Sequence, residues 1–134
     1  QIIRSFSSGV ERDEFINRRN SCPRQFGKAI SSFQGVQFKI ADMSIGIDAA
    51  RLLIQKAAWA KDNKMNYSIL ASQAKVFASE VAMKAAIDCV QIHGGYGYIR
   101  ETGVERLMRD AKITQIYEGT SEIQRVVIAR SLLK

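Results

Sequence analysis

The side chains best suited to chemistry lie in two glycine-containing turns in the C-terminal part of the chain. In one of them, Glu118 stands directly before Gly119, where the helical pattern is broken. A carboxylate there can act as the base that removes a proton next to a thioester, provided that burial raises its pKa. Gly119 permits the turn and leaves room for a substrate against the backbone. The alternative is an acid stabilised by a helix N-terminus, and the residue types alone favour that alternative.

The second turn contains Gly94 and Gly95, which follow a long helical pattern and predict its C-terminal end. His93 is the single histidine and has no His or Asp partner at catalytic spacing, so it is interpreted as a helix-end residue. The two cysteines, Cys22 and Cys89, lack the spacing of metal ligands, and no metal site is predicted. Cys89 lies on an apolar helical stripe, which predicts a small core residue and fits a reducing compartment.

Helical periodicity covers most of the chain after residue 33. Apolar residues recur at three- and four-residue steps and predict helices over residues 34–61, 67–93 and 104–113. A last helix follows, which Thr120 or Ser121 can cap. Gly46, inside the first of these helices, either costs about 1 kcal/mol relative to Ala or allows a neighbour to approach closely. The buried side of the second helix is predicted to contain Ile69, Leu70, Ala74, Phe77, Val81, Ala85, Ala86, Ile87 and Val90.

The remaining segments lack this regularity. Residues 24–33 are predicted to form a loop that turns at Gly27. Residues 1–22 carry a partial helical stripe that Pro23 closes, because the residue before a proline avoids helical geometry. No alternation typical of strands persists anywhere. The sequence therefore predicts an all-α, up-and-down helical bundle.

The overall composition excludes several classes of protein. A chain of 134 residues with 46% apolar and 25% charged residues is typical of one soluble globular domain. No apolar run approaches the ~20 residues of a membrane span, and the first residues are too poor in apolar side chains for a secretory signal. The net charge of +7 invites a nucleic-acid-binding interpretation. Acidic residues are interleaved with the basic ones and no aromatic residues accompany a basic run, so we expect no nucleic-acid binding.

Two groups of motifs resemble one known family. QIHGGYGY spans residues 91–98, ERLMRDAKITQIYEGTSEIQR spans 105–125, and upstream stand RQFGK at 24–28, FQ at 33–34 and QFKIADM at 37–43. They resemble the C-terminal helical domain of the acyl-CoA dehydrogenases, the flavoenzymes that oxidise fatty acyl thioesters. The resemblance divides the chain into a poorly matching segment, 1–22, and a domain, 23–134.

The resemblance implies an α,β-dehydrogenation. Glu118, in the motif Tyr117-Glu118-Gly119-Thr120, would take the α-proton while a hydride leaves the β-carbon for the flavin N5, which gives a trans-2-enoyl-CoA. The Glu118 backbone N–H and a flavin ribityl hydroxyl would polarise the thioester carbonyl. Tyr117 and Gly119 would line the substrate. A Glu at this position indicates the short- to medium-chain type.

The resemblance also implies an FAD site, to which it assigns Gln91, Gly95, Thr120, Glu122, Arg24, Gln25 and Gln34. Gln91 and Gly95 would contact the FAD of a neighbouring subunit, although a helix end alone explains both glycines of that turn. In the family an Arg that binds the FAD phosphate stands where this chain has Pro23. Arg24 follows one residue later and would have to reach the phosphate from a shifted loop.

The resemblance also implies partners and a location, and it leaves alternative functions open. The family implies a homo-oligomer (a dimer or tetramer) that passes electrons to electron-transfer flavoprotein, in the mitochondrial matrix or the bacterial cytoplasm. The N-terminal and middle domains of the family are not part of this sequence, so we expect a domain of a larger enzyme, or a truncated relative, that is inactive alone. A non-catalytic helical oligomerisation module stays open, as does an oxidase relative. The acyl-chain preference is not predicted.

Overall fold

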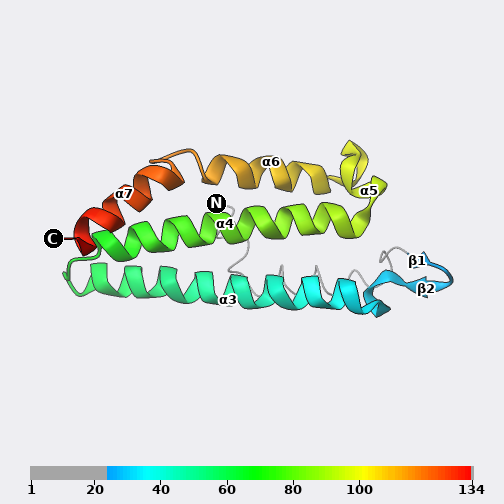
Figure 1. Ribbon diagram of the computed structural model, residues 1–134, viewed down its shortest axis with the longest axis horizontal. Coiled ribbons are helices and arrows are strands. Elements are labelled where there is room, and N and C mark those ends of the chain that lie inside the picture. The colour runs from blue at the N-terminus through cyan, green and yellow to red at the C-terminus, as the bar shows by residue number, and fades with distance from the viewer. Residues whose placement is uncertain (1–23, 134) are drawn as a thin grey trace.

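The computed structural model describes residues 24–133, so the predictions made for residues 1–22, including Cys22, and for Pro23 lie outside the described residues. Four longer helices dominate the described part: α3 (Gln34–Asp62), α4 (Ser68–His93), α6 (Val104–Thr114) and α7 (Ser121–Leu132). Figure 1 shows α4 in the middle, with α3 antiparallel to it on one side and α6 and α7 running back along the other. The prediction of an all-α, up-and-down bundle is confirmed.

The α3–α4 pair packs through small side chains rather than large ones. Ala50, Ala57 and Ala60 of α3 are buried, as are most alanines of α4. The two helices lie close together at Gly46, because a Cβ built on it would lie 3.1 Å from Cγ1 of Val81. The close approach predicted as one option for Gly46 is therefore what the structure contains, since alanine and glycine let two helix backbones approach each other.

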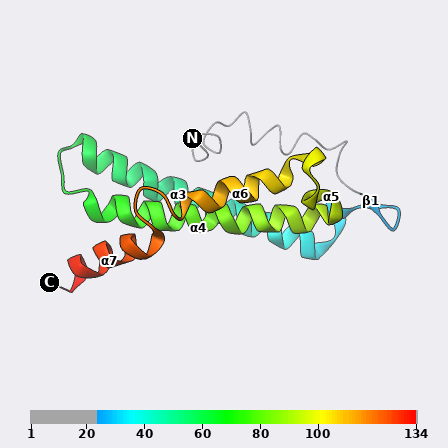
Figure 2. The same ribbon diagram turned by 90° about the horizontal axis from the view of Figure 1, so that it is seen from above.

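The predicted buried side of α4 is partly wrong. Ala74, Ala85 and Ala86 are buried, whereas Phe77 and Ile87 leave 38% and 49% of their surface exposed. Helix α4 contacts α3 on one side and α6 and α7 on the other, so more than one side of this helix is buried. Figure 2 shows α7 running at an angle to α4, away from α3.

The segment before α3 is more ordered than the predicted loop. Arg24–Gln25 (β1) pairs antiparallel with Lys28–Ala29 (β2), and a 3-10 turn, η2 (Ile30–Ser32), leads into α3. Gly27 lies in the turn as predicted, with φ +76°, and Phe26 has φ +52°. Two left-handed central residues make the type of turn whose twist matches that of paired strands, and this is why the two arms pair.

The predicted ends of α4 and α6 are confirmed. Gly94 follows α4 with φ +57°, a conformation that favours glycine. A single turn, α5 (Gly95–Tyr98), and the 3-10 turn η3 (Arg100–Thr102) then lead to Gly103, which precedes α6 with φ +70°. None of the helices within residues 24–133 is both long and apolar enough to cross a membrane.

Candidate functional site

The turn between α6 and α7 has an unusual backbone. Glu118 has φ +53° and Gly119 has φ +93°, so two consecutive residues adopt left-handed conformations. This conformation costs an L-residue such as glutamate about 1–2 kcal/mol. The backbone N–H of Ser121 donates to the Gln115 carbonyl at 3.0 Å and closes the turn. A strained glutamate is retained only where the surrounding contacts hold it.

Two side chains supply those contacts. Lys75, from the first half of α4, donates from Nζ to the carbonyl oxygen of Gly119 at 2.7 Å. Gln124, on α7, donates from Nε2 to the carbonyl oxygen of Glu118 at 3.2 Å. The carbonyls of two consecutive residues, Glu118 and Gly119, are thereby bound to neighbouring helices. The turn therefore has a defined position on the bundle, although its outer face is open.

Glu118 has an exposed side chain, so the burial expected for a general base is not provided within residues 24–133. The backbone N–H of Glu118 has no hydrogen-bond partner in this part of the chain. Tyr117 is 46% exposed, and Gly119 is half-buried beside it. The turn thus presents a carboxylate and a free backbone donor on the same residue.

Thr120 caps α7, which settles the choice between Thr120 and Ser121. Its Oγ1 accepts from the backbone N–H of Ile123 at 3.3 Å. The Oγ of Ser121 is buried and has no partner. The pKa of Glu122 lies below its ordinary value, first because its own backbone N–H donates to the carboxylate and then because of the Thr120 hydroxyl.

Thr120→Ala should therefore destabilise the protein by about 1 kcal/mol, because the first turn of α7 loses its side-chain acceptor. Ser121→Ala is the control, since it removes a buried hydroxyl without a partner and should be neutral or stabilising. Urea unfolding followed by circular dichroism measures both. An equal loss in the two variants would contradict the assignment of Thr120 as the cap.

The other predicted cofactor residues lie at the opposite end of α6. Gln91 is exposed on the last turn of α4, and Gly95 begins α5 at the same end of the molecule (Figure 1). Gly95 has neither a positive φ nor any atom within 4 Å of a Cβ built on it. The helix end therefore explains Gly94 but not Gly95, which corrects the prediction that it explains both.

The hairpin carries Arg24 and Gln25 to this end of the molecule as well, and Gln34 begins α3 beside it (Figure 1). Arg24 donates from Nη2 to the carbonyl oxygen of Gly27 at 3.2 Å. Gln25 and Gln34 are exposed. One guanidinium nitrogen of Arg24 thus closes the hairpin, while the group has five N–H donors in all.

His93 and Cys89 behave as the sequence predicted. His93 donates from Nδ1 to the backbone oxygen of Cys89 at 2.8 Å, which is a contact within the last turn of α4. Cys89 is 8% exposed, and burial raises the pKa of its thiol. Both are structural residues of the helix end.

The predicted site residues thus form two groups rather than one. Glu118, Thr120 and Glu122 follow α6, whereas Gln91 and Gly95 precede it. Helix α6 has 11 residues, which corresponds to about 16 Å at 1.5 Å per residue. A compact ligand cannot contact both groups of one chain. An extended ligand, or two ligand molecules, can.

A hollow between α3, α4 and the end of α6 was not predicted. Its volume is about 420 Å³, and its lining consists of Lys39, Asp42, Glu80, Met83, Lys84, Ile87, Asp88 and Gln115. A smaller hollow of about 140 Å³ lies next to it and is lined in part by Thr120, Glu122 and Arg125. Arg125 forms an ion pair with Glu80 between the two hollows, which joins α7 to α4.

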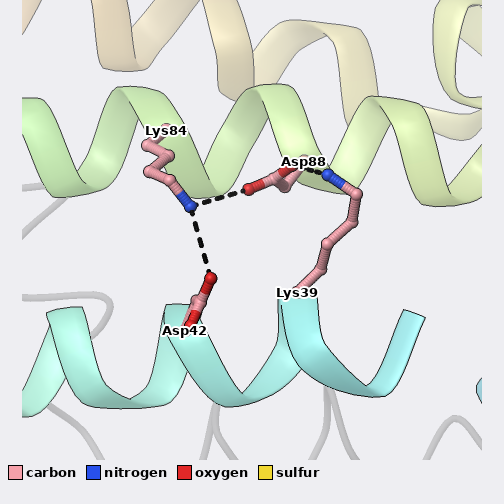
Figure 3. Close-up of polar contacts among 4 residues, drawn as sticks. All are labelled: Lys39, Asp42, Lys84 and Asp88. Atoms are coloured by element: carbon pink, nitrogen blue, oxygen red, sulfur yellow. Dashed lines mark hydrogen bonds and ion pairs between the residues drawn. The ribbon is translucent and has the colours of Figure 1, made fainter. Parts of the chain in front are cut away.

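Asp88 is the buried charge at the edge of the larger hollow. It is 7% exposed, and it accepts a hydrogen bond from Lys39 of α3 and another from Lys84 at 3.3 Å (Figure 3). Lys84 also lies 4.0 Å from Asp42. The hydrogen bond from Lys39 is the main cause that holds the pKa of Asp88 below its ordinary value. The four-residue spacing of Lys84 and Asp88 was visible in the sequence, but the contact with Lys39 was not.

Because the pKa of Asp88 is lowered, the stability of the protein should fall as the pH falls. The folded state binds a proton at Asp88 less readily than the unfolded state, so the stabilisation is present above the unfolded pKa of about 4 and is lost as the pH falls further. Asp88→Asn should cost about 1–2 kcal/mol at pH 7, and less below pH ~4. Asp48→Asn, at an exposed pair with Arg51, should change stability by less than ~0.5 kcal/mol. Urea unfolding at both pH values tests this, and an equal loss at both would contradict it.

Comparison with known proteins identifies the domain. The family described as "Acyl-CoA dehydrogenase, C-terminal domain" matches residues 14–133. The probable acyl-CoA dehydrogenase YngJ of Bacillus subtilis (strain 168) is 59% identical over 111 residues, which are 83% of this chain and 29% of that protein. The subunit CarC of the caffeyl-CoA reductase-Etf complex of Acetobacterium woodii is 51% identical over 111 residues, with the same two shares.

A solved structure gives the same result. Butyryl-CoA dehydrogenase from Megasphaera elsdenii superposes with a TM-score of 0.86 at 44% sequence identity, over 99% of this chain and 33% of that chain. This chain therefore spans about a third or less of the length of the relatives that it matches.

Proposed function

Since the chain belongs to the acyl-CoA dehydrogenase family, we propose that it is the C-terminal helical domain of an FAD-dependent enzyme that oxidises an acyl-CoA to a trans-2-enoyl-CoA. The observation that carries this proposal is the turn over residues 115–120. Its Glu118 combines an exposed carboxylate with a free backbone N–H, at a strained φ that Lys75 and Gln124 help to hold. The Glu118 N–H makes no hydrogen bond within residues 24–133.

In the proposed reaction Glu118 acts twice. Its carboxylate accepts the proton from the α-carbon of the acyl group, and its backbone N–H donates to the thioester carbonyl oxygen, where negative charge develops. Because the carboxylate is exposed in this chain, its desolvation has to come from the substrate and from the rest of a longer protein. Tyr117 and Gly119 contact the substrate beside it. FAD, when bound, would supply the acceptor for the hydride that leaves the β-carbon.

The residues proposed to hold FAD fit such a group in three respects. The backbone conformation at position 95 does not require glycine. The absence of a Cβ there lets a ligand approach the backbone closely. Arg24 keeps N–H donors beyond its bond to Gly27, enough for a phosphate. Gln91, Gln25 and Gln34 are exposed amides at the same end.

The two groups of site residues support a shared cofactor arrangement. Thr120 and Glu122 follow α6, whereas Gln91 and Gly95 precede it, and α6 itself is about 16 Å long. We propose that the second group contacts the FAD of a neighbouring subunit, in a homo-oligomer. The division of the chain at residue 22 belongs to the same proposal.

The partner and location follow from the relatives. CarC belongs by name to a complex with Etf, and on that basis we propose electron-transfer flavoprotein as the electron acceptor. The relatives named above are bacterial, and we propose the bacterial cytoplasm ahead of the mitochondrial matrix. The short- to medium-chain type remains part of the proposal, with butyryl-CoA as the first substrate to test.

The test is anaerobic bleaching of the flavin by butyryl-CoA. A longer gene product that contains this domain should bind FAD and lose its visible flavin absorbance when butyryl-CoA is added. The 134-residue chain alone should do neither. If the longer product binds FAD and a series of acyl-CoA substrates leaves the flavin oxidised, the dehydrogenase proposal fails. A helical module for oligomerisation then becomes the better description.

A further inference from the structure

Lys75 of helix α4 reaches across the bundle to the turn that contains Glu118. Its Nζ donates to the carbonyl oxygen of Gly119 at 2.7 Å, over a sequence separation of 44 residues, and the contact is partly buried. A hydrogen bond from a charged donor is shorter and roughly twice as strong as a neutral one. The other side-chain bond to this turn, from Gln124 to the Glu118 carbonyl oxygen, is exposed and longer, at 3.2 Å. Lys75 therefore makes the stronger of the two contacts.

The backbone of Glu118 and Gly119 depends on such contacts, because the main chain holds the turn only at its two ends. The N–H of Tyr117 bonds back to α6, and the N–H of Ser121 closes the turn. In the described part of the chain, neither the N–H nor the C=O of Glu118 or Gly119 makes a backbone hydrogen bond. Glycine has the freest backbone of any residue type. The direction of the Gly119 carbonyl therefore has to be fixed by a side chain.

The dipole of α7 does not account for a lysine at this place. Gly119 stands directly before Thr120, which is the N-cap of α7. The N-terminus of a helix carries the positive end of the helix dipole, so an ammonium group beside it is unfavourable. What Lys75 gains there is its hydrogen bond to the Gly119 carbonyl oxygen.

We propose that Lys75 is a positioning residue for the reaction of Glu118. By fixing the Gly119 carbonyl it holds the left-handed backbone of Glu118 next to it, and so the direction of both the carboxylate and the backbone N–H. This role rests on the proposed function of Glu118 as the base, and Lys75 itself touches neither substrate nor cofactor. A displacement of about 1 Å at a reacting group can slow a reaction by ~10²-fold, so the loss of this contact should be measurable.

The first test follows the turn by NMR in the 134-residue chain, without cofactor or substrate. Lys75→Met keeps the apolar stem of the side chain and removes the donor. The carbonyl ¹³C resonance of Gly119 should move upfield in this variant, because its oxygen loses a charged donor. Lys75→Arg retains charged N–H donors and should move the resonance less. Lys56→Met, at an exposed lysine of α3, is the control and should leave it unchanged.

The second test uses the longer enzyme and stopped-flow reduction of its flavin by butyryl-CoA. Lys75→Met should lower the limiting rate by about 10–100-fold and change the affinity for butyryl-CoA by less than about threefold, because a residue that only orients the base acts on the rate. Lys75→Arg should recover most of the lost rate, and Lys56→Met should behave as the wild type. Circular dichroism checks that each variant is folded.

Two results would overturn the proposal. If the Gly119 resonance is the same in Lys75→Met as in the wild type, Lys75 does not hold the turn. If the resonance moves while the rate stays at the wild-type value, Lys75 is a structural residue without a role in the reaction. A wild-type enzyme that no acyl-CoA reduces overturns the proposed function of Glu118, and the role of Lys75 in that reaction with it. The Gly119 resonance then still shows whether Lys75 holds the turn.

Discussion

Glu118→Gln in the longer enzyme is expected to slow flavin reduction by butyryl-CoA by about 10²–10⁴-fold, the range for removing a general base. The substitution removes the proton acceptor but keeps the backbone N–H that we assign to the thioester carbonyl. It also keeps the carbonyl oxygens that bind Lys75 and Gln124, so the turn should retain its position. The binding of butyryl-CoA should therefore change by less than about threefold. Stopped-flow measurement of flavin absorbance at several substrate concentrations separates the rate from the affinity.

Glu101→Gln is the control for this experiment, because Glu101 is an exposed acid on η3, outside both groups of site residues. It should leave the rate of reduction unchanged. If Glu118→Gln reduces the flavin at the wild-type rate, Glu118 is not the base and reverts to an acid near the start of α7. A loss of affinity with an unchanged rate would show that Glu118 binds the substrate rather than deprotonating it.

Gly97→Ala should be the most damaging single change to the fold, with a cost of about 3 kcal/mol. Gly97 is buried in α5, and a Cβ there would lie 2.5 Å from the Val90 carbonyl oxygen and 2.9 Å from the His93 Cβ. The first is a backbone atom of α4, which cannot rotate away, so α5 has to shift as a unit. The midpoint of thermal unfolding should fall by roughly 10 °C.

Gly95→Ala, two residues earlier, is the matched control, and it should not lower the stability of the fold. A Cβ at Gly95 meets no atom within 4 Å, and its φ is not positive, so alanine in this turn of helix should be neutral or stabilising by up to about 1 kcal/mol. In the longer enzyme the same substitution should weaken FAD binding, if Gly95 contacts the cofactor. Equal melting temperatures for the two alanine variants would contradict the packing described for α5.

The sequence by itself determined the parts of this protein that depend on neighbouring residues. Periodicity located α3, α4 and α6 to within a residue or two, and glycines marked the turns at Gly94 and Gly119. These features are local, because a helix repeat, a left-handed residue and a cap each involve only a few consecutive positions. The motifs around Glu118 also identified the family, which the comparisons confirm over residues 14–133.

Tertiary structure decided what depends on residues distant in the sequence. It placed Lys39 against Asp88, bound Lys75 to the turn of Glu118, and separated Gln91 and Gly95 from Thr120 and Glu122 by the length of α6. It also left Phe77 and Ile87 exposed, although their spacing predicted burial. The physical reason is that an apolar stripe indicates which side of a helix avoids water, but it does not indicate which neighbouring element covers that side. Within residues 24–133 mainly small side chains are buried between the helices, and many of the large apolar ones remain exposed.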